Sequence, residues 1–264
     1  MAHHEVEMVT VGSPGDVAEH GFFCYKSKPK SDGYRRKLAW LEDRFAEGLQ
    51  IRIVKEDGRS VGFIEYTSGE FAWRPVTAPG YLFVHCLWVV GGAKEKGYGS
   101  RLLEACVDDA RAMGKHGVAA LTKKGGYLVG RRLFLKHGYE VVDRAPPGFE
   151  LVAKRFGDAP APASPTNWEE RQCRHGEGLT VLYADQCPYL RDAVQQALDV
   201  ADEVGIEKRR AIELSTAQEV QDLAPCPYGT LGIVYAGSLL TCTPLGAKRL
   251  RQRLEEAHIR GHNE

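Results

Sequence analysis

The 264-residue sequence predicts an α/β protein with two domains, and three features support this fold class. Residues 81–90, YLFVHCLWVV, are an almost unbroken run of strand-forming apolar residues, which is typical of a strand buried on both faces. A Gly-Lys loop and then a helical apolar pattern follow this run. Pro alternates with small residues between positions 156 and 167, and beyond this segment strand and helix patterns alternate again.

The Pro/Ala-rich segment sets the expected domain boundary. Its composition favours extended backbone and cannot build a core. At roughly 150 residues per domain, the length of the chain also favours two domains. We therefore expect a first domain at residues 1–156, a linker at 157–177 and a second domain at 178–264.

The charge balance narrows the class of partner. Lys plus Arg number 35 and Asp plus Glu number 35, so no global basic field attracts a nucleic acid or an anionic membrane. No run reaches the ~18 apolar residues that a membrane span needs, and the N-terminus does not resemble a secretory signal. Seven dispersed cysteines are not a disulfide framework. We expect a cytoplasmic protein, and the sequence does not indicate its oligomeric state.

The first domain alternates strand-like and helical patterns. The expected strands are residues 6–11, 49–58, 59–69, 81–90 and 117–123. The expected helices are a helical region at 16–47, a helix that presents Leu102, Leu103, Cys106, Val107, Ala110 and Met113 on one face, and a short helix at 131–137 that Gly138 ends.

The loop between the buried strand and the long helix suits an anionic ligand. Gly97 and Gly99 let the backbone approach a ligand, and the first-turn N–H groups of a helix attract phosphate. Lys94 and Lys96 add positive charge. The spacing fits neither a P-loop nor a Rossmann fingerprint. The alternative is an ordinary strand-to-helix connection with solvated lysines.

Two motifs in this domain resemble the GNAT N-acetyltransferases. Residues 94–99, KEKGYG, are similar to the acetyl-CoA loop of that family, with Lys94 in the Gln/Arg position. Leu87 to Val89 resemble the end of its splayed fourth strand, and residues 134–139, FLKHGY, resemble its later motif. The resemblance covers approximately residues 6–154. It implies a GNAT fold and direct acetyl transfer from acetyl-CoA to an amine that the sequence does not identify.

The same resemblance implies a set of residues that bind acetyl-CoA. They are Leu87, Val89, Val90, Lys94, Glu95, Lys96, Gly97, Tyr98, Gly99, Ser100, Arg101, Phe134 and Lys136.

The sequence indicates a candidate base and a candidate oxyanion donor for this reaction. His85 is the candidate base, on the same strand face as Phe83 and Leu87 by simple alternation, and the alternative is a structural histidine. The resemblance implies that the backbone N–H of Val89 or Val90 polarises the thioester oxygen.

The sequence differs from the family at the residue expected to protonate the leaving thiolate. Phe134 stands where the family commonly has Tyr, and its ring has no proton to give. Tyr127 and Tyr139 are candidate replacements. Otherwise the thiolate leaves unassisted, or the protein is a non-catalytic acyl-CoA-binding regulator. Glu65, Tyr66 and Glu70 either line an acceptor pocket or form a solvated strand end.

The second domain has the element order βαβαββα, which is that of a thioredoxin core. Its expected strands are 179–184, 211–215, 230–237 and 238–244, and its expected helices are 187–205, 216–224 and 246–259. It resembles the thioredoxin-like, YoaP-like domain that follows some GNAT domains, most closely along residues 225–230, PCPYGT.

Cys187 occupies the place of a thioredoxin nucleophile at a helix N-terminus, although Leu190 replaces the resolving cysteine. If Pro225 or Pro227 is cis, Cys226 could lie near Cys187 and form a disulfide switch or a soft metal or metalloid site. The alternative is a vestigial fold that serves as a docking module. No zinc-site spacing is present, so we expect no metal site of that kind.

Overall fold

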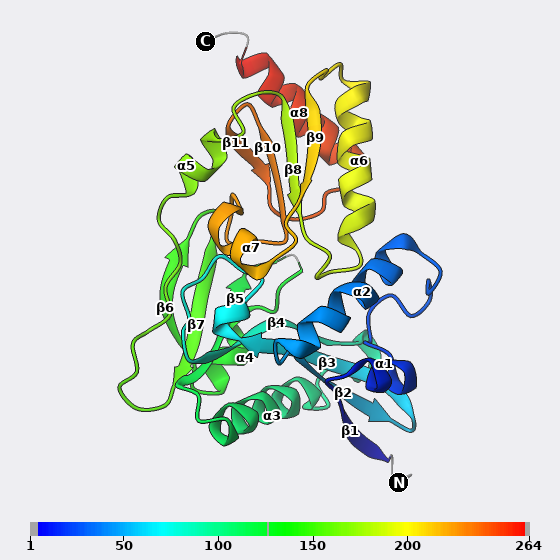
Figure 1. Cartoon of the computed structure of the whole chain (residues 1–264), viewed down its shortest axis with the longest axis vertical. Helices are drawn as coiled ribbons and strands as arrows, with labels where there is room; N and C mark the ends of the chain where they lie inside the picture. The colour runs from blue at the N-terminus through cyan, green and yellow to red at the C-terminus, as the bar shows by residue number, and fades with distance from the viewer. Residues whose placement is uncertain (1–4, 126, 262–264) are drawn as a thin grey trace. The chain divides into compact units, whose positions relative to one another are not determined.

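The computed structural model describes residues 5–125 and 127–261 and divides the chain into two compact units (Figure 1). Unit 1 comprises Met1–Lys28, Leu38–Ala72 and Val76–Ser164. Unit 2 comprises Pro29–Lys37, Trp73–Pro75 and Pro165–Glu264. No helix within the described ranges is long and apolar enough to cross a membrane.

Unit 1 is built on a seven-stranded mixed sheet in the order β1-β2-β3-β4-β5-β7-β6. Neighbouring strands are antiparallel except for β4 and β5, which are parallel. The strands are β1 (Val6–Val11), β2 (Gln50–Glu56), β3 (Arg59–Ser68), β4 (Tyr81–Val89), β5 (Gly117–Lys123), β6 (Glu140–Ala145) and β7 (Phe149–Arg155). The five strands expected from sequence are confirmed, whereas β6 and β7 were not predicted.

The helices of unit 1 differ from expectation at one place. The expected helical region at 16–47 is two helices, α1 (Pro14–His20) and α2 (Asp32–Ala46), because Gly21 ends the first at φ 69°. The others are α3 (Tyr98–Ala112) and α4 (Arg131–Lys136), with short 3-10 turns η1 (Gly69–Phe71) and η2 (Gly91–Ala93). The first part of α2, up to Lys37, belongs to unit 2. Figure 1 shows α3 along one side of the sheet and the unit 1 part of α2, from Leu38, on the other.

The apolar pattern of α3 forms the main core of unit 1. Leu102, Leu103, Cys106, Val107 and Ala110 are all buried against the sheet, as their helical spacing predicts. Met113 was expected on this face but is 48% exposed, because the helix has already ended at Ala112. The packed face fixes the position of the helix N-terminus that follows the Gly-Lys loop.

A half-buried polar cluster holds α3 to the sheet on the same face. Two nitrogens of Arg52 on β2 donate to the carboxylate of Asp109 on α3, at 2.6 and 3.0 Å. The hydroxyl of Tyr66 on β3 donates to the same carboxylate. Burial raises the pKa of Tyr66, so its hydroxyl remains a donor throughout the physiological range.

Unit 2 contains a four-stranded sheet in the order β11-β10-β8-β9. β8 (Leu179–Tyr183) is parallel to β9 (Arg209–Glu213) and antiparallel to β10 (Leu231–Tyr235), and β10 pairs antiparallel with β11 (Ser238–Thr241). The helices are α5 (Trp168–Cys173), α6 (Leu190–Glu203), α7 (Ala217–Leu223) and α8 (Ala247–Gly261). From β8 onward the element order is the expected βαβαββα.

Three details of unit 2 correct the sequence-based expectations. Helix α6 begins at Leu190, so Cys187 lies in the preceding turn and not at the helix N-terminus. The cis peptide bond among the described residues is Pro146–Pro147, so Pro225 and Pro227 follow trans bonds. The expected linker at 157–177 contains α5, whose buried Arg171 donates to the carbonyl of Gln221 at 2.7 Å.

The Asp109 cluster gives a stability prediction. Asp109→Ala leaves the guanidinium of Arg52 and the hydroxyl of Tyr66 without their shared acceptor, so we expect a loss of about 2 kcal/mol in the free energy of unfolding. Urea denaturation measures this loss. Asp108→Ala is the control, because the Asp108 side chain is 75% exposed and its contact with Arg111 is 3.7 Å long. Equal effects of the two substitutions would contradict the role of the cluster.

Candidate active site

The parallel strands β4 and β5 separate halfway along their length. They pair from Tyr81 with Gly117 to Val84 with Ala120, whereas β4 continues to Val89 and β5 to Lys123. A cavity lies where pairing stops. Its lining comes from β4, β5, the loop before α4, and α4 itself: Val84, His85, Cys86, Leu87, Ala120, Leu121, Tyr127, Leu128, Val129 and Phe134.

The free edge of β4 presents backbone groups to this opening. The N–H of Val90 donates to the carbonyl of Val61 at 2.9 Å, so it is not available to a ligand. In an antiparallel ladder, residues alternate between pointing their N–H at the partner strand and away from it. Leu87 and Val89 therefore direct their N–H groups away from β3, toward the opening. The expectation for Val90 is wrong, and Val89 is the candidate oxyanion donor.

A β-bulge in β4 places His85. Glu65 pairs with Cys86 and Tyr66 pairs with Val84, so His85 is an extra residue on β4. The bulge resets the alternation of side chains beyond it. Leu87 joins the core against α3, while the His85 ring lies near the Phe83 ring at 6.2 Å between centroids. The expectation that His85 and Leu87 share a face is therefore wrong.

His85 is buried beside a carboxylate. Its Nδ1 lies 3.3 Å from Oε1 of Glu65, and the two side chains are 0% and 3% exposed. The ring of Trp40, from α2, lies 6.5 Å from the imidazole. The two side chains therefore form a buried acid–base pair at the edge of the cavity.

Glu65, Tyr66 and Glu70, in or just after β3, lie in three different environments. Glu65 and Tyr66 are 2% and 1% exposed, so a solvated strand end is wrong for both. Glu65 reaches His85, whereas Tyr66 belongs to the Asp109 cluster on the other side of the sheet. Glu70 is exposed and accepts a hydrogen bond from the N–H of Gly80 at 2.7 Å. A buried ion pair cannot be read from the sequence, since it depends on strand register.

The Gly-Lys loop leads directly into α3. Gly97 is the N-cap residue at φ 82°, a left-handed conformation that glycine adopts without strain. A Cβ at Gly97 would meet no atom within 4 Å, so the surface here is open to a ligand. Because the first-turn N–H groups of α3 have no carbonyl partner within the helix, Tyr98, Gly99 and Ser100 offer donors beside this open surface.

The side chains of the loop make contacts of different kinds within the protein. The Tyr98 side chain is buried, and its hydroxyl donates to Glu56 at 2.8 Å. Lys96 donates to the same carboxylate at 2.8 Å, which neutralises part of the charge expected here. Lys94 lies 5.6 Å from the centre of the exposed Trp88 ring.

The remaining residues predicted to bind acetyl-CoA lie on α3 and α4 and in the loop. Ser100 Oγ is 2.8 Å from Nε2 of His137, which ties the start of α3 to the end of α4. Glu95 has φ 69°, and the side chains of Glu95, Arg101 and Lys136 are exposed.

Phe134 and the two candidate tyrosines occupy different environments. Phe134 is 2% exposed and lines the cavity. Tyr127 also lines the cavity and is 51% exposed. Tyr139 packs edge-on against Phe134, is 3% exposed, and its hydroxyl has no hydrogen-bond partner among the described residues. Burial raises the pKa of Tyr139, which keeps its proton in place. Tyr127 is the tyrosine that faces the site.

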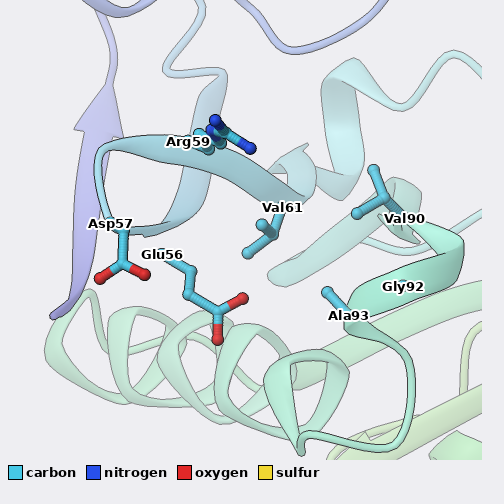
Figure 2. Close-up of a pocket in the computed structure, with 7 residues that line it drawn as sticks. All are labelled: Glu56, Asp57, Arg59, Val61, Val90, Gly92 and Ala93. Carbon is cyan, nitrogen blue, oxygen red and sulfur yellow. The ribbon is translucent and has the colours of Figure 1, made fainter. Parts of the chain in front are cut away.

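A second pocket lies on the other side of the loop (Figure 2). It has an apolar wall that includes Val61 and Ala93, and Glu56 and Asp57 place carboxylates at its rim. Arg59 also lines the pocket, and Glu56 already accepts hydrogen bonds from Lys96 and Tyr98. The pocket therefore presents charges of both signs beside the loop.

Comparison with known proteins identifies the family. The sequence profile of the Acetyltransferase (GNAT) family matches residues 17–139. The uncharacterized N-acetyltransferase YoaP of Bacillus subtilis (strain 168) is 31% identical over 231 residues, which are 86% of this chain and 90% of that protein. The chain belongs to the GNAT acetyltransferase family. It is a GNAT-type N-acetyltransferase, and the acetyl donor of this family is acetyl-CoA.

Other relatives match shorter segments. An L-methionine sulfoximine/L-methionine sulfone acetyltransferase of Salmonella typhimurium is 31% identical over 84 residues, 32% of this chain and 47% of that protein. The chain therefore matches about half the length of that relative. The solved structure of yncA from Salmonella typhimurium with acetyl-CoA has a TM-score of 0.43 and 17% identity, over 59% of this chain and 96% of that one.

The cysteines of unit 2 are free thiols in the structure. Cys226 is buried and donates from Sγ to the carbonyl of Leu231 at 3.3 Å. Its hydrogen-bonded thiol neighbour is Cys242, which the sequence analysis did not consider. Burial raises the pKa of the Cys226 thiol, and a buried protonated thiol is a poor nucleophile. Cys187 is half-buried in the turn before α6.

The GNAT loop gives a binding prediction at Gly99. A Cβ there would meet the nearest atom, on Leu133, at 3.5 Å, and Gly99 is already helical, so Gly99→Glu fits the free protein. An acidic residue in the first turn stabilises a helix, yet it repels phosphate. We expect unchanged or higher thermal stability and at least roughly tenfold weaker acetyl-CoA binding by calorimetry.

Gly246→Glu is the matched control for this experiment. Gly246 directly precedes α8 in unit 2 and also has open space at its Cβ position. We expect acetyl-CoA binding by this variant to equal that of the unaltered protein. Retention of full affinity in Gly99→Glu would place the pyrophosphate elsewhere.

Proposed function

We propose that the protein transfers the acetyl group of acetyl-CoA directly to an amine in the opening between β4 and β5. The observation that carries this proposal is the separation of the two strands beside the glycine-capped start of α3. The free backbone edge of β4 borders the cavity, and the start of α3 lies against the same strand, because the Cβ position of Gly99 is within 4 Å of the Leu87 and Val89 side chains. A pantetheine arm would pair with Leu87 and Val89, while the first-turn N–H groups of α3 would hold the pyrophosphate.

The residues proposed to contact the donor follow from these positions. Gly97, Tyr98, Gly99 and Ser100 contribute backbone donors and close approach. The exposed side chains of Lys94, Glu95, Arg101 and Lys136 form the outer part of the site, and Phe134 provides an apolar wall for the thioester. Lys96 acts through Glu56 to fix the loop.

The chemistry asks three things of the protein. His85 accepts the proton of the attacking amine, directly or through a water, and Glu65 stabilises the imidazolium that results. The N–H of Val89 donates to the thioester oxygen as negative charge develops on it. Tyr127 donates its phenolic proton to the sulfur as the carbon–sulfur bond breaks, in the role that Phe134 cannot fill.

The identity of the amine is open, and relatives indicate where to search. A relative from Salmonella typhimurium is named for acetylation of L-methionine sulfoximine and L-methionine sulfone, and one from Escherichia coli is an L-amino acid N-acyltransferase. We therefore propose small amino-acid-like amines as the first panel. Release of free thiol from acetyl-CoA with any of them establishes transfer, and tight binding without release would favour a non-catalytic acyl-CoA-binding regulator.

Unit 2 is proposed to be a thioredoxin-like domain. Its sheet order β11-β10-β8-β9 and the element order from β8 to α8 support this assignment. The burial of Cys226 and its contact with Cys242 do not favour a Cys187–Cys226 switch. A docking or stabilising module is the function that suits this unit.

The base role of His85 predicts a specific pH dependence. In His85→Ala the amine must lose its proton to bulk water, so we expect kcat/KM to fall about 10²-fold at pH 7. The defect should shrink as the pH approaches the amine's own pKa, because the neutral amine needs no base. Acetyl-CoA affinity should not change. A defect that is the same at every pH would indicate a structural histidine.

The acid role of Tyr127 has a matched control in Tyr139, a buried tyrosine that does not line the cavity. We expect Tyr127→Phe to lower kcat at least roughly tenfold without altering acetyl-CoA binding. Tyr139→Phe should leave kcat unchanged, because its buried hydroxyl makes no hydrogen bond within the described residues. Steady-state thiol release measures both variants. If Tyr127→Phe keeps full kcat, the thiolate leaves without help from this residue.

A further inference from the structure

A basic pocket lies at the carboxyl end of β5, between the start of α4 and the turn that joins β6 to β7. It has a volume of about 660 Å³, within the range of small-molecule sites. Its charged lining residues are Lys123, Lys124, Arg131, Arg132, Arg144 and Glu150.

The pocket carries a surplus of positive charge. Five of these six side chains are cationic, and the single carboxylate, on Glu150, is shared by Arg131 at 2.7 Å and Arg144 at 3.5 Å. Lys124 and Arg132 make no hydrogen bond or ion pair with any residue in the described ranges. Since the whole chain has equal numbers of acidic and basic residues, this surplus is a local feature.

The pocket also has an apolar floor. Phe149 is 1% exposed, and the ammonium group of Lys123 lies 4.3 Å from the centre of its ring. An apolar floor with cations around it suits the oxyanion of a small organic molecule, whose charge lies among the cations while its carbon skeleton contacts apolar residues of the pocket such as Pro146.

The pocket adjoins the cavity between β4 and β5. On β5, Leu121 lines the cavity and the next residues, Thr122 to Lys124, line the pocket. In the loop, Tyr127 to Val129 line the cavity and Gly130 to Arg132 line the pocket. The two hollows therefore share two continuous walls.

The position of the pocket separates it from the donor site. In the sheet, β5 stands between β4 and β7, so the pocket on β5, β6 and β7 lies on the side of β5 away from β4. The loop after β4, proposed to hold the pyrophosphate, lies on the other side. An anion bound in the basic pocket is therefore a different group from the donor's pyrophosphate.

We infer that this basic pocket binds an oxyanion of the acceptor, so that the substrate is an amine that also carries a carboxylate or a phosphate. The inference rests on the proposed acetyl transfer for its acceptor role. The pocket anchors the anion while the amine reaches into the cavity beside His85. Recognition by Lys124 and Arg132 then favours amines that carry a carboxylate or phosphate over amines that carry neither.

The first experiment tests the pocket without any need for turnover. Inorganic phosphate is the probe, added to protein saturated with acetyl-CoA so that the donor site is already filled, with ionic strength matched by KCl. We expect phosphate to raise the melting temperature of the unaltered protein by about 2 °C or more. In Lys124→Glu/Arg132→Glu the rise should vanish, because the pocket then repels the anion.

Lys248→Glu/Arg249→Glu is the matched control. It makes the same change of charge at two exposed positions on α8 and should keep the full phosphate effect. Acetyl-CoA affinity should change less than about twofold in both variants. An equal phosphate effect in all three proteins would overturn the pocket, and so would a large loss of acetyl-CoA affinity in the pocket variant, which would assign these cations to the donor.

The second experiment identifies the anion. Thiol release is compared within two pairs of amines, L-serine with L-serinamide and O-phosphoethanolamine with ethanolamine. A preference of at least roughly tenfold for the first member of one pair, lost in Lys124→Glu/Arg132→Glu, assigns a carboxylate or a phosphate respectively. Equal rates within both pairs overturn the acceptor role. If no amine gives thiol release, the proposed acetyl transfer is wrong. The phosphate experiment then still shows whether the pocket binds an anion.

Discussion

The extra residue in β4 is the constraint on which the candidate site depends. His85 has no partner in the ladder with β3, and pairing of β4 with β5 stops at the residue before it, Val84. A bulge twists its strand and moves the following residues out of regular register. In this protein it coincides with the separation of the two parallel strands, which opens the cavity and frees one edge of β4. The same bulge turns the His85 ring toward the buried carboxylate of Glu65.

The site also separates its charges by position. Backbone N–H groups at the start of α3 attract phosphate with fixed partial charges, while the nearby Glu56 is occupied by Lys96 and Tyr98. On the far side of β5, lysine and arginine side chains surround an apolar floor. Fixed donors suit a group that every GNAT donor shares, whereas long side chains suit recognition of a particular acceptor.

Unit 2 shows how far residue patterns support a chemical role. Cys187 and the Pro225–Pro227 segment resemble a redox site in sequence, but the helix begins three residues after Cys187 and the prolines are trans. Cys226 is buried, with its thiol bound to a backbone carbonyl and to Cys242. Thiol reactivity depends on thiolate formation and access, and burial opposes both at Cys226. The element order of this unit therefore agrees with expectation, whereas the environment of Cys226 does not favour the expected redox role.

The sequence by itself determined the α/β class, the family, the five central strands of unit 1, the loop before α3 and the element order of unit 2. These features depend on local composition and spacing, such as the apolar run at 81–90 and the glycines at 97 and 99. The tertiary structure alone decided the bulge at His85 and the His85–Glu65 contact. It also decided that the Val90 N–H bonds to the Val61 carbonyl and that five cations from three segments line one pocket. Each of these depends on strand register or on packing between residues distant in sequence, and a one-residue shift in register reverses the direction of every later side chain.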